Sequence, residues 1–165
     1  MTTSHLTTSR CLIMPPTIDD APLVMALMTD PEVRRYLGGP ASRERAEARA
    51  QKLANAGNPH AWVVHLRGQS SGGVGLISLT SHHDGIDSEI SYEFQTPVWG
   101  VGIASETVGT VLAHALEHLD YNRLIAETQA ANGPSRRLLE RLGLRQEREL
   151  ERFGAAQVIY ATGRS

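Results

Sequence analysis

The hydrophobic pattern changes its period between residues 88 and 119, and a pair of glycines marks the change. Residues 88–95, SEISYEFQ, alternate polar and apolar side chains, which predicts a β-strand with two different faces. Gly100 and Gly102 lie in the connection that follows this strand. Beyond it, apolar side chains recur at the spacing of a helix with one buried face: Ala104, Val108, Val111, Leu112, Ala115 and Leu119. A strand that leads through a tight turn into an amphipathic helix predicts an architecture in which helices cover a sheet.

The rest of the chain extends this pattern. We expect helices after an N-cap at Thr17 and over Ser42–Ala56, Ala104–Leu119 and Pro134–Leu142. Strands are expected over Ser9–Met14, Ala61–Leu66, Val74–Leu79, Ser88–Gln95, Arg123–Ala131, Leu144–Phe153 and Gln157–Thr162. Asp30-Pro31 repeats the helix-start signal before a short segment that ends at Gly38-Gly39. The order β-α-α-β-β-β-α-β-α-β-β predicts an α/β fold in a single domain over residues 1–165, with a mixed central sheet of about seven strands flanked by about four helices.

Composition excludes several classes of protein. The chain has 16 basic and 18 acidic residues, a formal net charge of −2, so no nucleic-acid partner is expected. No stretch approaches the ~20 consecutive apolar residues of a membrane helix, so no membrane partner is expected either. Cys11 is the one cysteine, and the amino end has no signal-like apolar run, which together predict a cytoplasmic protein without disulfides. We expect Cys11 to be a small packed side chain.

The connection PVWGVGIASE, residues 97–106, is suited to binding an anion. Glycine lets a ligand approach the backbone closely, and the amides from Gly102 to Ser105 have no partner inside the helix that they open. Together with the helix dipole, such amides bind phosphate or pyrophosphate. The alternative is a tight turn that needs glycine and binds nothing. The P-loop pattern is absent, and Ser105 stands where a dinucleotide fold has its third glycine, so both of those motifs are rejected.

Residues 99–106, WGVGIASE, resemble motif A of the GNAT superfamily of N-acetyltransferases, [QR]-x-x-G-x-[GA]. The resemblance is greatest to the W-G-x-G-x-A-[ST]-E form of the Rim-type ribosomal-protein alanine N-acetyltransferases. Residues 132–144, NGPSRRLLERLGL, are similar to the N-x-x-S-x-x-x-L-x-x-x-G-[FL] segment of the same group. The segments Ser9–Ala21 and Asp30–Val33 also look like that group, so the likeness covers essentially the whole chain. It implies a GNAT-like fold, whose order of elements is the order given above.

The resemblance implies that acetyl-CoA is the co-substrate and that no metal is needed. Its pyrophosphate would lie on the amides from Gly100 to Ser105, and its pantetheine arm would run beside the strand at residues 92–95. Asn132 would bind the arm near the thioester, and Ser135 would lie close to the sulfur. The full set that the resemblance assigns to acetyl-CoA is Tyr92, Phe94, Gln95, Gly100, Val101, Gly102, Ile103, Ala104, Ser105, Asn132 and Ser135.

Two positions depart from the family pattern. Trp99 takes the [QR] position, as it does within the Rim-type group, and Val101 stands where Arg or Lys is frequent. Val101 removes one charge that could pair with a phosphate, whereas the backbone amides are unaffected. We therefore expect weaker, not absent, binding of CoA.

Acetyl transfer to an amine needs a group that takes up a proton. A free α-amine has a pKa of about 7.7–8.0 and is partly protonated at neutral pH, so a carboxylate acting directly or through water is required. Glu89 and Glu93 share the polar face of the predicted central strand, and Glu89 is the first choice; the alternative is a structural carboxylate paired with an arginine. A backbone N–H of that strand can stabilise the oxyanion. Ser135 is the positional candidate for protonating the departing thiolate.

Two further groups of residues were considered as sites. Residues 114–118, HALEH, match the inverted zinc-protease pattern H-x-x-E-H, but no third ligand can be named from the sequence. His82, His83 and Asp84 are expected to form a solvated loop, with contact to the acceptor amine as the alternative.

Three functions follow, in order of preference. The first is transfer of an acetyl group from acetyl-CoA to a primary amine, on the N-terminus of a protein or peptide or, as the close rival, on a small molecule such as an amino acid, antibiotic or polyamine. The second is a non-catalytic CoA-binding sensor, and the third is a zinc hydrolase. A homodimer is suggested by family likeness alone.

Overall fold

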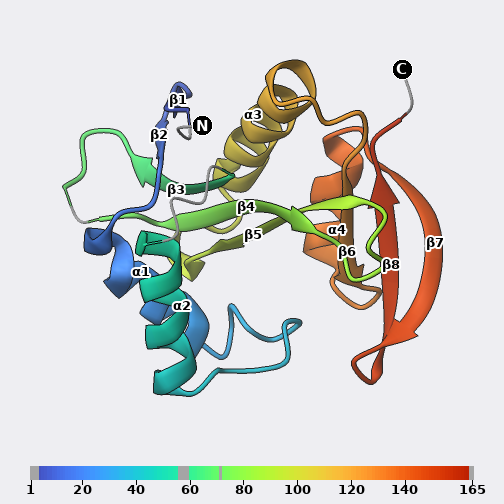
Figure 1. The fold of residues 1–165 in the computed structure, drawn as a ribbon, viewed down its shortest axis with the longest axis horizontal. Helices are drawn as coiled ribbons and strands as arrows, with labels where there is room; N and C mark the ends of the chain where they lie inside the picture. The colour runs from blue at the N-terminus through green and yellow to red at the C-terminus, as the bar shows by residue number, and fades with distance from the viewer. Residues whose placement is uncertain (1–3, 56–59, 71, 164–165) are drawn as a thin grey trace.

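The computed structural model describes residues 4–55, 60–70 and 72–163, whose strands form one sheet of eight (Figure 1). The strands lie across the sheet in the order β1 (Leu6–Thr7), β2 (Cys11–Met14), β3 (Ala61–Leu66), β4 (Gly75–Ser81), β5 (Ser88–Phe94), β6 (Ile125–Gln129), β8 (Ala155–Ala161) and β7 (Arg145–Arg152). The helices are α1 (Ala21–Thr29), α2 (Arg43–Asn55), α3 (Ile103–His118) and α4 (Gly133–Arg141). The mixed α/β fold is therefore confirmed, with the two-residue strand β1 in addition to the seven strands expected.

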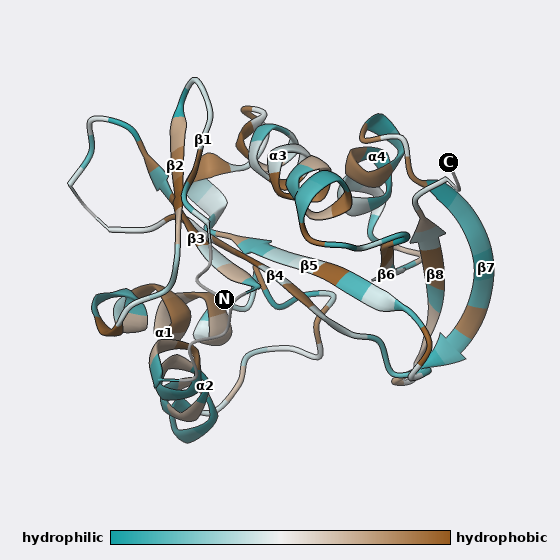
Figure 2. Cartoon of the chain, turned by 45° about the horizontal axis from the view of Figure 1, so that its top comes forward, coloured by the Kyte–Doolittle hydropathy of each residue, from teal (hydrophilic) through white to brown (hydrophobic). Residues whose placement is uncertain are grey.

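The helices cover the two faces of the sheet in pairs. Figure 2 shows α1 and α2 on one face and α3 and α4 on the other. On the α3 side, buried residues of the helix such as Val108 and Val111 pack with Trp62 of β3 and Tyr160 of β8. Cys11 is fully buried in the same cluster, as expected of a packed side chain. No helix among the described residues is both long enough and apolar enough to cross a membrane.

Local sequence signals explain where the first helical segment begins. The side chain of Thr17 accepts a hydrogen bond from the amide of Asp19, and the Asp20 carboxylate accepts one from the amide of Thr17 at 2.7 Å. These reciprocal bonds form the expected capping box, which satisfies backbone donors that the first turn leaves unpaired. A short 3-10 turn at Ile18–Asp20 leads into α1.

The start signal at Asp30-Pro31 does not produce a helix. The Asp30 side chain accepts a hydrogen bond from the amide of Glu32, but residues 31–38 form successive turns. The guanidinium of Arg34 donates to the carbonyls of Leu37 and Gly39. The expectation of a helical segment here was wrong: the amides of Leu37 and Gly39 both bond to the carbonyl of Arg34, so the backbone bonds close turns and do not continue a helix.

Strands β5 and β6 are the one parallel pair, and they separate almost at once. Their register contains a single pair, Glu89 with Ile125, after which the two strands diverge. All other neighbouring strands are antiparallel, and β6 pairs with β8 over five residues on its other side. The sheet therefore opens in its middle, and the backbone edges that face this opening lack a strand partner.

The far edge of the sheet is strand β7. Six of its eight residues are exposed, and most are charged: its sequence is RQERELER. β7 pairs with β8 on one side, and charged side chains along its open edge discourage the pairing of a second chain there.

Gly75 of β4 allows the aromatic ring of Phe94 to lie across the sheet at the end of β5. The two residues are paired in register, and a Cβ built on Gly75 would lie 2.3 Å from the Phe94 ring. We predict that Gly75→Ala lowers the free energy of unfolding by about 1–3 kcal/mol, because the ring has to move. Gly163→Ala is the matched control, since its Cβ meets no atom within 4 Å. Urea denaturation of both variants measures the difference, and equal stabilities would contradict this prediction.

Candidate active site

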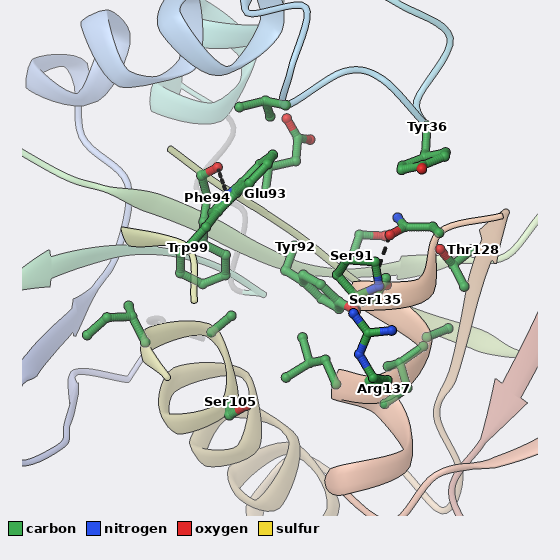
Figure 3. A pocket seen from close by; sticks show the side chains of 18 of the residues that line it. Tyr36, Ser91, Tyr92, Glu93, Phe94, Trp99, Ser105, Thr128, Ser135 and Arg137 are labelled. Atoms are coloured by element: carbon green, nitrogen blue, oxygen red, sulfur yellow. Dashed lines mark hydrogen bonds between the residues drawn. The ribbon is translucent and has the colours of Figure 1, made fainter. Parts of the chain in front are cut away.

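A cleft of about 800 Å³ opens between β5 and β6 where they diverge. Residues 90–94 of β5 and 126–128 of β6 form its sides. The turn into α3 and one side of α4 line one end of the cleft. The turns between α1 and α2 line its other end (Figure 3). The cleft thus lies at the opening in the sheet that the single parallel pair creates.

The glycine turn presents backbone amides to one end of the cleft. Gly100 and Gly102 have φ angles of 75° and 84°, a region that glycine adopts readily, and α3 begins directly after Gly102. The first amides of α3 therefore have no carbonyl partner within the helix. The residues of this turn that line the cleft are Gly100, Gly102, Ile103, Ala104 and Ser105. Val101 is not among the lining residues, and 55% of its surface is exposed.

Three side-chain contacts fix the position of this turn. The indole N–H of Trp99 donates to the carbonyl of Phe94 at 2.8 Å, which ties the turn to the end of β5. Arg10 donates to the carbonyl of Val101 at 2.7 Å and pairs with Glu106, in the first turn of α3, at 2.9 Å. Trp99, at the position where the family pattern has Gln or Arg, thus serves as an anchor of the turn.

A cation from α4 lies beside the start of α3. Arg141 donates from Nη2 to Oγ of Ser105 at 3.2 Å, and both residues line the cleft. Arg137, one turn earlier on the same helix, also lines the cleft (Figure 3). Positive charge near the amides, which Val101 does not supply, therefore comes from Arg141 of α4 and from Arg10, whose charge is shared with Glu106.

Tyr92 and Ser135 meet across the cleft. The Tyr92 hydroxyl lies 2.7 Å from Oγ of Ser135, which joins β5 to the first turn of α4 (Figure 3). Asn132 caps α4, and its side-chain oxygen accepts a hydrogen bond from the amide of Ser135 at 3.2 Å. Burial raises the pKa of Tyr92 to about 12, against the opposing effect of the bond to Ser135. Both hydroxyls are therefore proton-bearing at neutral pH and able to donate.

The two carboxylates of β5 have different surroundings. Glu93 lines the cleft and pairs with Arg49 of α2 at 2.9 Å. Glu89 is not among the lining residues; its Oε2 accepts a hydrogen bond from the amide of Glu127 at 3.1 Å. Burial raises the pKa of Glu89, while that hydrogen bond acts in the opposite direction. Glu89 therefore supports the point where β5 and β6 separate. Gln95 also lies outside the cleft, and its amide donates to the carbonyl of Val74.

Glu127 of β6 is a cleft carboxylate that the sequence analysis did not propose. Its side chain is only 7% exposed, and Oε1 lies 2.7 Å from Nε2 of His82 and 3.4 Å from Arg152. Among the described residues, no hydrogen bond is made to its second oxygen, Oε2. The one available signal was an acidic residue in the middle of an apolar strand. Its partners could not be found, because they lie far away in the sequence.

His82 corrects one expectation. It was expected in a solvated loop, but only 3% of its surface is exposed, because the loop folds back against β6. His83, next to it, is exposed as expected. The pattern H-x-x-E-H remains on α3, and no group of three or more potential metal ligands occurs among the residues that the structure describes.

Residues 10–145 match the family model described as an acetyltransferase (GNAT) domain. The chain belongs to the GNAT acetyltransferase family. The protein YnaD of Bacillus subtilis (strain 168), which is named an N-acetyltransferase, is 30% identical over 145 residues, 87% of this chain and 84% of the relative. A GNAT-family acetyltransferase structure from Bacillus anthracis is 25% identical, with a TM-score of 0.82 over 96% of this chain and 97% of that one. The ribosomal-protein-S5-alanine acetyltransferase of Vibrio fischeri has a TM-score of 0.75 over 96% of both chains at 14% identity, which shows the same fold.

GNAT domains use acetyl-CoA, and Arg141 stands where it can pair with a phosphate of that molecule. We predict that Arg141→Ala weakens the binding of acetyl-CoA about threefold to tenfold, because one charge-assisted contact is lost. Arg43→Ala is the control, since Arg43 lies on the exposed side of α2 and pairs with Glu47. Isothermal titration calorimetry measures both dissociation constants. Equal affinities for the two variants would show that Arg141 contributes no charge to the site.

Proposed function

We propose that this GNAT acetyltransferase acts on a primary amine, and specifically on the N-terminal α-amine of a protein or peptide, as Rim-type enzymes do. The observation that carries the proposal is the cleft itself, because it combines a helix N-terminus at one end, a pair of hydroxyls beside β5 and a carboxylate on β6. The resemblance of WGVGIASE to the Rim-type form supports the choice of acceptor. We further propose that residues 1–165 are a single domain and that it works in the cytoplasm.

The geometry supports a direct attack of the amine on the thioester. The pyrophosphate of acetyl-CoA would bind the amides at Gly100–Ser105, and the pantetheine arm would take the backbone edge of β5 that β6 leaves open. A backbone N–H on the same edge would donate to the oxyanion of the tetrahedral intermediate. The departing thiolate would take a proton from Ser135, whose hydroxyl is bonded to that of Tyr92. Asn132 would orient Ser135 by capping α4.

We propose that Glu127, rather than Glu89, accepts the proton of the amine. Glu127 lines the cleft, and its Oε2 is not engaged by any described residue. Glu89 faces away from the lining and holds the amide of residue 127. Glu89 therefore helps to hold the backbone of residue 127 in place, whereas Glu127 is the one of the two that lines the cleft.

Binding of the co-substrate is the first test of this proposal. A ligand at 100 times its Kd adds roughly 2.7 kcal/mol to stability, which raises the midpoint of thermal unfolding by about 2–8 °C. We predict this shift with acetyl-CoA and no shift with NADH, in EDTA-treated protein. Turnover is then measured with peptides bearing free N-termini and with a panel of small amines. Acetylation of small amines alone would replace the proposed acceptor, and binding without any turnover would favour a CoA sensor.

The second test separates the two carboxylates. We predict that Glu127→Gln lowers kcat by about 10²–10⁴-fold, the usual contribution of a general base. Glu89→Gln retains an oxygen that accepts the amide hydrogen of residue 127, so its effect should stay within about tenfold. Steady-state kinetics with saturating acetyl-CoA measure both. The reverse order of effects would assign the base to Glu89, as the sequence alone suggested.

A further inference from the structure

His82 lies directly behind the cleft and is enclosed by carboxylates. It follows β4, and its backbone amide donates to the carbonyl of Asp87, which closes the loop between β4 and β5. Its Nε2 lies 2.7 Å from Oε1 of Glu127, and its Nδ1 lies 3.1 Å from Oδ2 of Asp84. The ring itself has no exposed surface. His82 therefore connects the proposed base in the cleft to a carboxylate in the loop.

Asp84 holds a negative charge on the side of the His82 ring opposite Glu127. Its Oδ1 accepts hydrogen bonds from the amides of Ile86 and Asp87, and its Oδ2 also pairs with Arg148 of β7. These backbone bonds, with the contact to His82, hold the pKa of Asp84 well below its usual range. The ring of His82 thus has an anion on each nitrogen.

The charge of His82 follows from all groups around it. Burial lowers the pKa of His82, but the hydrogen bonds to Glu127 and Asp84 and the field of Glu89 raise it by more, so the net direction is upward. Arg152 of β7 contacts Glu127, and the ring of His83 lies 5.6 Å from that of His82. Two carboxylates contact the ring directly, whereas Arg152 contacts it only through Glu127, and this arrangement favours the charged form of His82.

Glu127 needs a donor such as His82 beside it if it is to accept a proton from the amine. Its side chain is almost wholly buried, and Glu89 lies close enough to bond its amide. A buried carboxylate needs a cation or an N–H donor beside it, and His82, at 2.7 Å, lies nearer to Oε1 of Glu127 than Arg152 does, at 3.4 Å. His82 donates from Nε2 to Oε1 of Glu127 when the ring is an imidazolium, and also when the ring is neutral and Nδ1 accepts the amide hydrogen of Asp84 at 3.3 Å. The opposite oxygen, Oε2, is left for the cleft.

We propose that His82 is a positioning residue for acetyl transfer, which holds Glu127 as a carboxylate and directs its Oε2 toward the acceptor amine. This inference rests on the proposed function in that Glu127 is the base. The proton of the amine passes to Oε2 of Glu127 as nitrogen bonds to the acetyl carbon, and His82 keeps its own protons throughout. Asp84 acts one step further away, by holding the imidazolium.

The kinetic test uses His82→Gln, which keeps an N–H near the position of Nε2 but carries no charge. We predict that the acid limb of the kcat–pH profile moves upward by about one pH unit, because the cation that stabilises the Glu127 carboxylate is gone. His83→Gln, a neighbouring exposed histidine, is the matched control and should leave the profile in place. Unfolding midpoints and acetyl-CoA affinities of both variants establish that the fold is retained. A fall in kcat that is equal at every pH, or no change, would overturn the proposal.

A second measurement does not depend on the acceptor. The imidazole signals of His82 and His83 are followed by NMR as a function of pH in wild type and in Glu127→Gln. We predict that His82 titrates above about 6.5, the ordinary value for histidine, and that Glu127→Gln lowers its pKa by about one unit or more, while His83 is unchanged. Titration of wild-type His82 at or below the ordinary value, or no response to Glu127→Gln, would overturn the proposal. A wild-type protein that acetylates no amine would refute the proposed function instead, and the NMR titration would still decide the role of His82.

Discussion

The single parallel pair in the sheet determines where everything else in the site can lie. Between Glu89 and Ile125 the strands are in contact, and beyond that point they separate. Separation leaves backbone groups of both strands without the partners that a continuous sheet provides, and such groups must be satisfied in another way. The Glu89 carboxylate satisfies one of them, the amide of Glu127. The remaining open edge of β5 is suited to an extended ligand with its own amide groups, such as a pantetheine arm. The glycine turn lies at the end of this edge because α3 is the next helix after β5 in the chain.

Much of the fold could be predicted because its signals are local. The alternation over residues 88–95 and the apolar face of α3 are each determined by one short run of consecutive residues, and glycines mark the turn between them. The capping box at Thr17 is equally local. Residues 31–38 were not predictable in the same way, because a helix-start signal at Asp30-Pro31 is also compatible with the successive turns that form there. The short strand β1 could not be predicted, since two residues are too few to show an alternation of polar and apolar side chains.

The glycine turn and the start of α4 were predictable for the same reason, and the surroundings of the cleft carboxylates were not. Glycines 100 and 102 and Asn132 act through the backbone next to them, so a short motif specifies them. The proposed role of Glu127 depends on His82, 45 residues earlier in the chain, and on the loop that buries this histidine. Glu89 was the base that the sequence predicted. Its place on the polar face of a central strand made it a plausible base, yet the carboxylate turns to the neighbouring strand rather than to the cleft.

The strand order β6-β8-β7 also affects how the protein folds during synthesis. Strand β6 carries Glu127, and on the side away from the cleft it pairs with β8, residues 155–161, rather than with β7, which is made first. Until those residues have left the ribosome, β6 has no antiparallel neighbour, and the wall of the cleft that it forms cannot be fixed. Such a long separation between contacting segments slows folding and prolongs the exposure of apolar strands. In the nascent chain the glycine turn is therefore complete well before the β6 wall of the cleft has its antiparallel neighbour.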